Sequence, residues 1–578
     1  MKKYLRKYLT INYNCKFRVG EVVENNLSRI KSEMIGFLDK FKSLSIRARQ
    51  TLFLQCIMVF DKSYFDMHMS DPNENQNFFS EILRYGYPIF IRYFYDKEFV
   101  NQIGIPLQAM DEPRLALCHE ILLTCKTIGW IEHVEDNQRY GNFVVTETGK
   151  NIRIKFAKKY HWNEYLESQY HSLYSHIMAL ARHEEYEALD KDKKRIMQKM
   201  QSMVSVWYND FMSYANDMEV EEYFHSYAEL DMEQDTDWDM FGPNDLFGRI
   251  KYDDYVYSIM DFSGYAIKHY YFAHILKELK PQLLFENLFY LCKTKDDLVK
   301  LISENRELDL GDSNRIFECM TLGVHNASLY NQAMYCAAPF IQLSQTQVIQ
   351  SIAGTLHSPF SFMLQNLSSK YPKEWSINVR NREPLFRKEL YSIFNADNYL
   401  CIDRGVNIVS EKYGKTDIDA IIMDKNSGEI ALFQLKWQGP TYVSARAMHS
   451  KAKNYADETN KWLQIVNDWI NNSTAEKISS LLGIPKKYID KNKMFIFVLG
   501  RHHANYSADV ISDNRCAWGQ WYQFVSELQY VNPNASRISQ FYKLLMAHSP
   551  FKQKYTESPM EFQIGDYKII YGNCSSNQ

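Results

Sequence analysis

Residues 416–437, TDIDAIIMDKNSGEIALFQLKW, are the segment that most restricts how this chain can fold. Two runs rich in β-branched and apolar residues, at 416–424 and 429–437, have the composition and alternation typical of strands. The Lys-Asn-Ser-Gly stretch between them has the chemistry of a tight turn. The segment therefore predicts a pair of antiparallel strands joined by a short loop.

Strand alternation places the polar side chains of this hairpin on particular faces. Asp417 and Asp419 share one face of the first strand, and Gln434 and Lys436 share one face of the second. A separation of 434 − 419 = 15 residues suits a hairpin with a short turn. One face of the hairpin is therefore expected to gather Asp419, Gln434 and Lys436.

A carboxylate, an amide oxygen and an ammonium group on adjacent strands suit the hydrolysis of a phosphodiester. The transition state carries extra negative charge, which Mg²⁺ offsets while it also lowers the pKa of a bound water. Because Mg²⁺ prefers hard oxygen ligands, Asp419 is the main candidate ligand and the neutral Gln434 carbonyl oxygen is a weaker one. Lys436 would orient the attacking water and stabilise developing charge. These three residues are the candidate catalytic group.

An acid followed by Gln-x-Lys on the next strand resembles the PD-(D/E)xK, or restriction-endonuclease-like, nuclease superfamily in its Mrr-like Gln-x-Lys variant. The resemblance covers about residues 375–505 and implies an α/β domain with a mixed sheet, DNA as substrate, and Mg²⁺ or Mn²⁺ held by Asp419, Gln434 and the carbonyl of Leu435. Two departures are visible. Gln434 stands where the usual motif has an acid, and Ile418 stands in place of the proline.

A further acid precedes the hairpin. Pro384 fits the first turn of a helix, and the following LFRKELYSIF puts Glu389 on the same face as Phe386 and Leu390. A buried carboxylate is costly without a partner. Either an arginine pairs with Glu389, or Glu389 lies at the edge of the apolar stripe, or it is a metal ligand and a fourth candidate catalytic residue. The last explanation follows from the resemblance, because the superfamily often takes a glutamate from a helix at this place.

The sequence after the hairpin offers a basic surface. Residues 436–493 contain ten Lys or Arg and five Asp or Glu, a surplus that can follow a phosphate backbone. A long helix is expected at 442–470, and the apolar run 493–500 predicts a buried strand. A solvated helix face and a polar strand end are the alternatives. The candidate nucleic-acid contacts are Arg446, His449, Lys451, Lys453 and Tyr455 on the helix, and Arg501, His502 and His503 after the strand.

The first 370 residues predict a mostly helical region. Residues 1–105 and 161–370 have helical periodicity, and the window 217–239 holds ten acids and no Lys or Arg. That window is expected to be an exposed acidic loop or, alternatively, a segment that repels nucleic acid or competes for a basic cleft. A polar stretch with two prolines near residue 370 suggests a boundary before a nuclease-like domain at 375–530, and residues 531–578 are expected to form a C-terminal extension.

Residues 106–160 form a candidate winged-helix module. Residues 112–134 predict a helix that runs into a short strand, and 142–154 predict a second strand that ends at Thr-x-Thr-Gly before a new helix. A helix–hairpin packing unit inside a helical domain is the alternative. The candidate phosphate contacts of this module are Arg139, Lys150 and Arg153.

Bulk properties limit the remaining choices. A chain of 578 residues predicts several domains, and a net charge of −3 requires any nucleic-acid contact to come from a local patch. Ten cysteines without a CxxC pair favour reduced thiols in the cytoplasm, and no apolar stretch is long enough to predict a membrane span. We expect a DNA endonuclease, acting alone, as a homo-oligomer or with a partner protein in restriction or antiphage defence. The alternative is an inactive nuclease-like protein that binds or senses nucleic acid.

Overall fold

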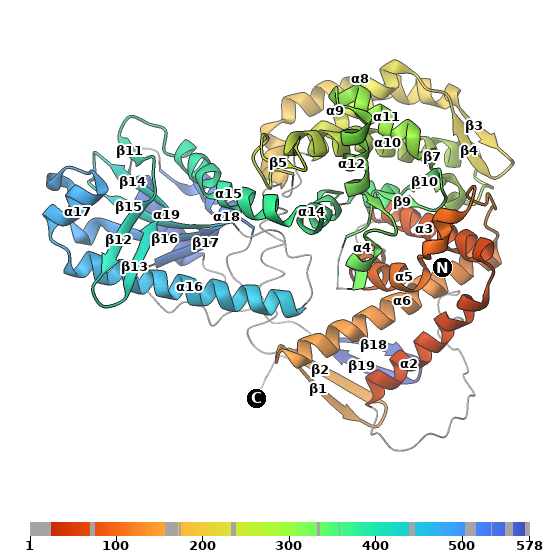
Figure 1. Cartoon of the computed structure of the whole chain (residues 1–578), viewed down its shortest axis with the longest axis horizontal. Coiled ribbons are helices and arrows are strands. Elements are labelled where there is room, and N and C mark those ends of the chain that lie inside the picture. The colour runs from red at the N-terminus through yellow and green to blue at the C-terminus, as the bar shows by residue number, and fades with distance from the viewer. Residues whose placement is uncertain are drawn as a thin grey trace.

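The chain forms an N-terminal helical lobe and a C-terminal α/β lobe, which meet along helix α15 (Pro372–Ser392) (Figure 1). The computed structural model describes residues 25–69, 76–156, 172, 175–232, 238–331, 336–357, 359–437, 445–502, 516–532, 535–548 and 559–572. A mostly helical N-terminal region followed by a region with a mixed sheet is the division that the sequence predicts. Within the described residues, no helix combines the length and apolarity needed to cross a membrane.

The helical lobe is organised around helices that are apolar on nearly every side. α3 carries Phe53, Ile57 and Phe60, all fully buried, because neighbouring helices surround it. Small sheets and hairpins interrupt the helices, so this lobe is not purely helical. The helices are α2 (Asn26–Asp39), α3 (Ile46–Met69), α4 (Gln76–Glu81), α5 (Tyr87–Phe94), α6 (Glu112–Arg139), α8 (His183–Met203), α9 (Met218–Met232), α10 (Tyr252–Leu279), α11 (Lys295–Arg306), α12 (Leu310–Met320), α13 (Ile352–Leu356) and α14 (Pro359–Lys370). The strands are β3 (Val204–Trp207), β4 (Phe211–Tyr214), β5 (Leu246–Phe247), β6 (Ile250–Lys251), β7 (Cys292–Thr294), β8 (Thr321–Leu322), β9 (Phe340–Gln342) and β10 (Gln347–Gln350).

The acidic window at 217–239 is helical over most of its length, so the expectation of a loop is wrong for residues 218–232. Asp217 begins α9 by accepting the backbone N–H groups of Glu219 and Val220, which a carboxylate at a helix N-terminus does well. Lys199 pairs with both Asp217 and Glu219. Local basic partners therefore offset part of the acidic charge.

The candidate winged-helix module differs from its expected order. α6 continues to Arg139 as one helix where a short strand is expected, and Thr148-Gly149 forms the turn of a hairpin, with Gly149 at φ +59°. The hairpin consists of β1 (Phe143–Thr148) and β2 (Asn151–Phe156). Arg139 pairs with Asp136 at 3.3 Å, Lys150 pairs with Asp566 at 2.7 Å, and the Arg153 side chain is exposed.

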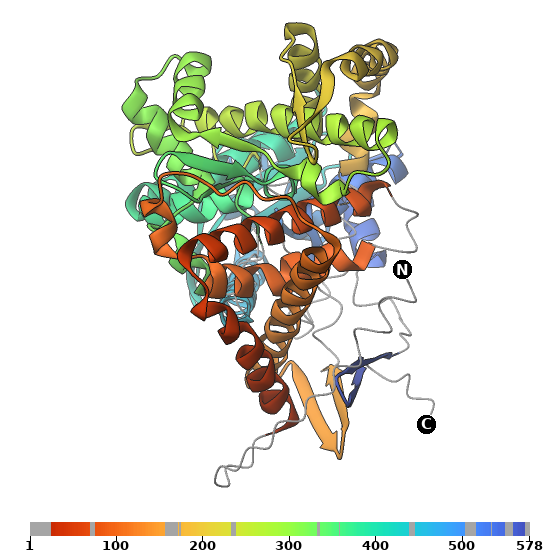
Figure 2. The same cartoon turned by 90° about the vertical axis from the view of Figure 1, so that its right-hand side faces the viewer.

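The end of the chain completes this module instead of forming a separate extension. β19 (Tyr567–Tyr571) pairs in parallel with β2, and β18 (Met560–Ile564) pairs with β19, which gives the strand order β1-β2-β19-β18. Figure 2 shows this sheet below the helical lobe, beside α2 and α6. The preceding helix, α19 (Arg537–Ala547), lies elsewhere and packs on the α/β lobe through Phe541 and Leu545.

The α/β lobe is built on a five-stranded mixed sheet of order β11-β14-β15-β16-β17. β14 runs antiparallel to both of its neighbours, β11 and β15, whereas β15, β16 and β17 run parallel to one another. α16 and α17 cover one face, and α15, α18 and α19 cover the other. The elements are β11 (Tyr399–Ile402), β12 (Val406–Ser410), β13 (Gly414–Ile418), β14 (Ala420–Asp424), β15 (Ile430–Lys436), α16 (Ala445–Asn472), α17 (Ala475–Leu482), β16 (Met494–Gly500), β17 (Cys516–Gln520) and α18 (Trp521–Ser526).

Several predicted elements are confirmed in this lobe. β14 and β15 form the predicted antiparallel hairpin, and the predicted long helix and buried strand correspond to α16 and β16. β15 is apolar on both sides because Leu432 packs toward α16 while Phe433 packs toward α18. Two boundaries differ from the expectation. α15 begins at Pro372 and contains Pro384 in its interior, and the strand predicted at 416–424 is divided at Asp419.

Candidate functional site

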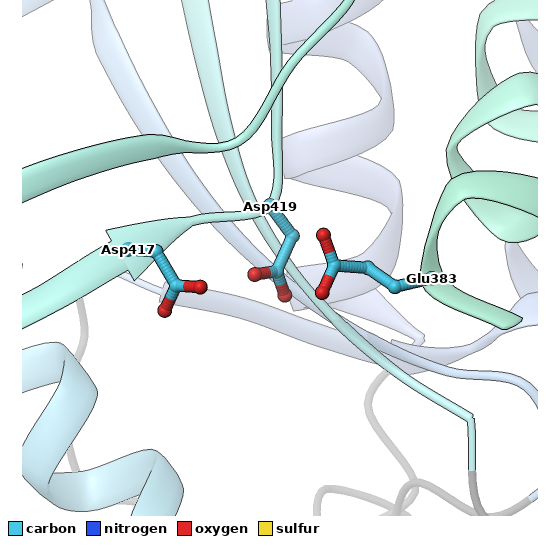
Figure 3. A group of neighbouring side chains, drawn as sticks. All are labelled: Glu383, Asp417 and Asp419. Carbon is cyan, nitrogen blue, oxygen red and sulfur yellow. The ribbon is translucent and has the colours of Figure 1, made fainter. Parts of the chain in front are cut away.

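Three carboxylate groups converge where α15 meets the divided strand. Glu383, Asp417 and Asp419 each offer one oxygen, and these three oxygens lie within 4.8 Å of one another. Figure 3 shows Glu383 reaching across from its helix toward the two aspartates. Asp419 is buried, Glu383 is half-buried and Asp417 is exposed, so the group lies at the boundary between core and solvent. We refer to these three residues as the acidic triad.

Asp419 occupies the point at which the chain changes its strand partners. Up to Ile418, β13 pairs with β12, and from Ala420 onward β14 pairs with β11 and β15. The Asp419 N–H donates to the carbonyl of Phe433 at 3.0 Å, while its own carbonyl accepts from Arg387. Both backbone groups are thus satisfied at the break, which a buried position requires.

The Asp419 carboxylate is held from the neighbouring strand. The Leu435 N–H donates to Oδ2 at 2.6 Å, and the Gln434 side-chain amide donates to the same oxygen. The predicted meeting of Asp419 with Gln434 is therefore found in the structure. Leu435 contacts the acid through its N–H, whereas the family resemblance implies a role for its carbonyl oxygen.

Lys436 is the last residue of β15, and its charge acts on two members of the acidic triad. Its ammonium group is 3.2 Å from Oε2 of Glu458 on α16, and it is close enough to favour the charged forms of Asp419 and Glu383. The structure thus brings Asp419, Gln434 and Lys436 together, as the hairpin predicts.

The surroundings of Asp419 and Glu383 favour the protonated forms of these two acids when no cation is bound. Burial raises the pKa of Asp419 to about 8, and the charges of Glu383 and Asp417 add to the shift, while the Leu435 N–H and Lys436 oppose it. Burial also raises the pKa of Glu383, against the influence of Arg387. Bringing a divalent cation to these oxygens would offset the repulsion between them.

Glu389 lies away from the triad and has an arginine partner, which is one of the explanations that the sequence allows. Its carboxylate pairs with the guanidinium group of Arg501, which also pairs with Asp239. Glu383 and Glu389 are six residues apart on α15, about 240° around a helix of 3.6 residues per turn, so they face different directions. The helix contributes Glu383 to the acidic triad instead of Glu389.

Three of the predicted nucleic-acid contacts belong to the core, so these predictions are wrong. Tyr455 and His502 are fully buried, and Arg501 is 2% exposed. The Tyr455 ring packs on Trp518 with ring centres 5.4 Å apart. These side chains cannot reach a phosphate backbone in this arrangement.

The other candidate contacts differ in accessibility. Lys453 is exposed on α16, whereas Lys451 is half-buried and has a pKa lowered by that burial and by Arg382. Arg446 and His449 fall within α16, but their side chains lie outside the described part of the structure, and His503 lies outside it altogether. Lys453 is thus the one α16 candidate whose described side chain is open to solvent.

Sequence reasoning missed two members of the acidic triad. Asp417 carries a signal, since its i,i+2 spacing to Asp419 places both on one strand face. Glu383 lies outside the helix whose start Pro384 predicts, although Glu383 and Arg387 have the i,i+4 spacing of a helical ion pair. Comparison of the whole chain with family models, curated proteins and solved structures found no match.

Proposed function

We propose that this protein is a metal-dependent nuclease that hydrolyses phosphodiester bonds, with DNA as the expected substrate. The observation that carries the proposal is the acidic triad beside Lys436 and Gln434 at the edge of the mixed sheet. Acids that converge with a lysine are suited to holding a cation and a phosphate next to each other.

We further propose that the α/β lobe has the restriction-endonuclease-like fold. The chain order supports this assignment: a helix with an acid (α15), an antiparallel hairpin with an acid and Gln-x-Lys (β14 and β15), a helix (α16) and a parallel strand (β16). The site lies at the junction of these elements, where helix and strand side chains can approach one substrate.

The oxygen-only donor set of the acidic triad fits Mg²⁺ or Mn²⁺ better than a softer metal. Glu383, Asp417 and Asp419 would hold the cation, and rotation of the Gln434 amide would present its carbonyl oxygen. When bound, the cation would supply charge stabilisation at the phosphate and a more acidic water. Arg387, which pairs with Glu383, and Lys436, whose charge acts on Asp419, offset part of the negative charge of the three acids.

The chain's own residues would perform distinct tasks. Lys436 would place a positive charge beside the scissile phosphate, where negative charge develops. The Leu435 N–H would fix the Asp419 carboxylate through its donated hydrogen bond, and the Gln434 amide would add a second one until it turns toward the cation. Lys453 on α16 would contact the backbone of a nucleic acid that extends from the site.

Plasmid cleavage in Mg²⁺ or Mn²⁺ tests the proposal. Glu383→Gln, Asp419→Asn and Lys436→Ala should each abolish cleavage, while Asp403→Asn, which changes an exposed acid outside the triad, should retain it. Parallel assays on RNA would identify the preferred nucleic acid. Equal cleavage by the wild type and the three site variants would rule out this site as the nuclease centre.

The alternative is an inactive nuclease-like protein that binds or senses nucleic acid. It is favoured by one observation, namely that a neutral amide, Gln434, stands beside Asp419 where the resembled motif has an acid. DNA binding without cleavage in the wild type and in all three variants would support this alternative. Gln434→Glu adds the missing charge and should then increase the affinity for Mn²⁺ without creating cleavage.

A further inference from the structure

We infer that Arg387 is a positioning residue that fixes two of the proposed metal ligands, Glu383 and Asp419, relative to each other. The inference deepens the proposed function and rests on it. Arg387 does not belong to the acidic triad and is not expected to touch substrate, yet its guanidinium group contacts both the helix and the strand that supply the acids.

The two contacts come from different nitrogens of one rigid group. Nη2 of Arg387 pairs with Oε1 of Glu383, one turn earlier on α15, and Nε donates to the backbone carbonyl of Asp419. Because the guanidinium group is planar with a fixed arrangement of donors, the two bonds constrain each other. The residue is 8% exposed, so packing also limits its rotamers.

The bond to the Asp419 carbonyl acts at the one place where the strand is divided. The pairing of β13 with β12 ends at Ile418, and the pairing of β14 with β15 begins at Ala420. Asp419 therefore lies between two strand pairings and belongs fully to neither. Arg387 supplies a donor to the carbonyl at this break and ties it to α15. The direction of the Asp419 side chain therefore depends on a contact from another element.

The bond to Glu383 has a comparable effect on the helix side. Glu383 is half-buried, and a long side chain at such a position would otherwise sample several rotamers. Engaging Oε1 leaves the other carboxylate oxygen for the triad. Partners of this kind, which hold a ligand without binding the metal, typically change metal affinity by about 10–100-fold when they are removed.

A purely electrostatic role predicts the opposite sign. A guanidinium group near the site repels a divalent cation, so deleting its charge should tighten metal binding if charge is its only contribution. If Arg387 positions the ligands, deletion should weaken binding, and a lysine that keeps the charge without the two directed bonds should weaken it as well. The two variants Arg387→Lys and Arg387→Gln therefore separate charge from geometry.

The experiment measures Mn²⁺ binding to the full-length protein by electron paramagnetic resonance, independently of cleavage. We expect the dissociation constant for Mn²⁺ to rise by about tenfold or more in both Arg387→Lys and Arg387→Gln. Lys388→Gln, which removes an exposed charge from the next position on α15, is the matched control and should stay within about twofold of wild type. Thermal unfolding identifies a variant that does not fold.

A double variant keeps the inference testable if Arg387→Gln fails to fold. When Arg387→Lys is combined with Glu383→Gln, the lysine substitution should add little further loss, because one of the two ligands that Arg387 holds is already removed. Affinity as tight as wild type in Arg387→Lys, or tighter binding in Arg387→Gln, would overturn the inference. Wild-type protein that binds Mn²⁺ without cutting any nucleic acid would overturn the proposed function alone, and wild-type protein that binds no Mn²⁺ would overturn both.

Discussion

Asp239 and Arg501, 262 residues apart in the chain, form an ion pair that joins the two lobes. Asp239 comes from the end of the acidic window, and Arg501 follows the last residue of β16. The guanidinium group of Arg501 lies over the ring of Trp437 at 4.7 Å, and Trp437 directly follows Lys436. The helical lobe is therefore connected through this pair to the residue next to the candidate catalytic lysine.

A second arginine strengthens the same junction. Arg382 donates to the backbone carbonyl of Met240 at 3.0 Å, and its guanidinium group lies 4.2 Å from the ring centre of Phe241. The segment 239–241 is thus held by two buried arginines of the α/β lobe. Removing one of the two carboxylates that pair with the buried Arg501 leaves its charge less fully compensated, which makes this junction sensitive to single substitutions.

Asp239→Asn should loosen the junction. The change removes one of the two carboxylates that pair with Arg501, and we expect the free energy of unfolding to fall by about 1–3 kcal/mol. Hydrogen exchange should increase at residues 238–242 before other parts of the helical lobe. Asp190→Asn, at an exposed position on α8, is the control and should change neither measurement. Unchanged exchange at 238–242 would show that the ion pair does not hold the lobes.

Asp419→Asn should make the metal-free protein more stable at alkaline pH. The pKa of Asp419 is about 8 in the folded chain and 3.8 ordinarily, so the folded state binds more protons between these values. The stabilisation of the folded state that comes from protonated Asp419 is therefore present at low pH and is lost as the pH rises through about 8. Urea unfolding in EDTA measures the free energy of unfolding of the variant and of wild type, and the difference in favour of the variant should grow from about pH 5 to about pH 8.5. A difference that does not change with pH would contradict the raised pKa.

Lys453→Ala should weaken DNA binding, whereas Tyr455→Phe should leave it unchanged. Lys453 is exposed on α16. Losing one phosphate contact should lower the magnitude of the slope of the logarithm of the binding constant against the logarithm of the salt concentration by about 1. Tyr455 is fully buried against Trp518 and cannot touch the nucleic acid. Fluorescence anisotropy in EDTA at several salt concentrations measures both effects. A larger loss in Tyr455→Phe than in Lys453→Ala would contradict the assignment.

Ile569→Ala should destabilise the module that the end of the chain completes. Ile569 on β19 is fully buried against the sheet core, and truncating such a side chain costs about 2–5 kcal/mol. Ile570 is adjacent, half-buried and directed to the other face, so Ile570→Ala is a matched control with a smaller expected cost. Thermal unfolding of the full-length variants measures the difference. Equal costs for the two substitutions would mean that β19 does not pack in this way.

Elements whose signals are local can be predicted from the sequence alone. Alternation and the Lys-Asn-Ser-Gly turn predicted the β14–β15 hairpin, and the apolar run at 493–500 predicted β16. The same alternation predicted that Asp419, Gln434 and Lys436 share a face, because in a hairpin the register of a few residues fixes which side chains meet. These predictions needed no information from distant parts of the chain.

Which acids converge, and which cations they meet, depends on how elements that are remote in sequence pack together. Glu389 pairs with Arg501 while Glu383 joins Asp419, because α15 extends to Pro372 and its rotation about the sheet follows from packing on both lobes. The pairing of β19 with β2 likewise joins residues more than 400 positions apart. Local patterns specify faces and registers, but the choice among compatible partners depends on contacts between elements that are remote in sequence.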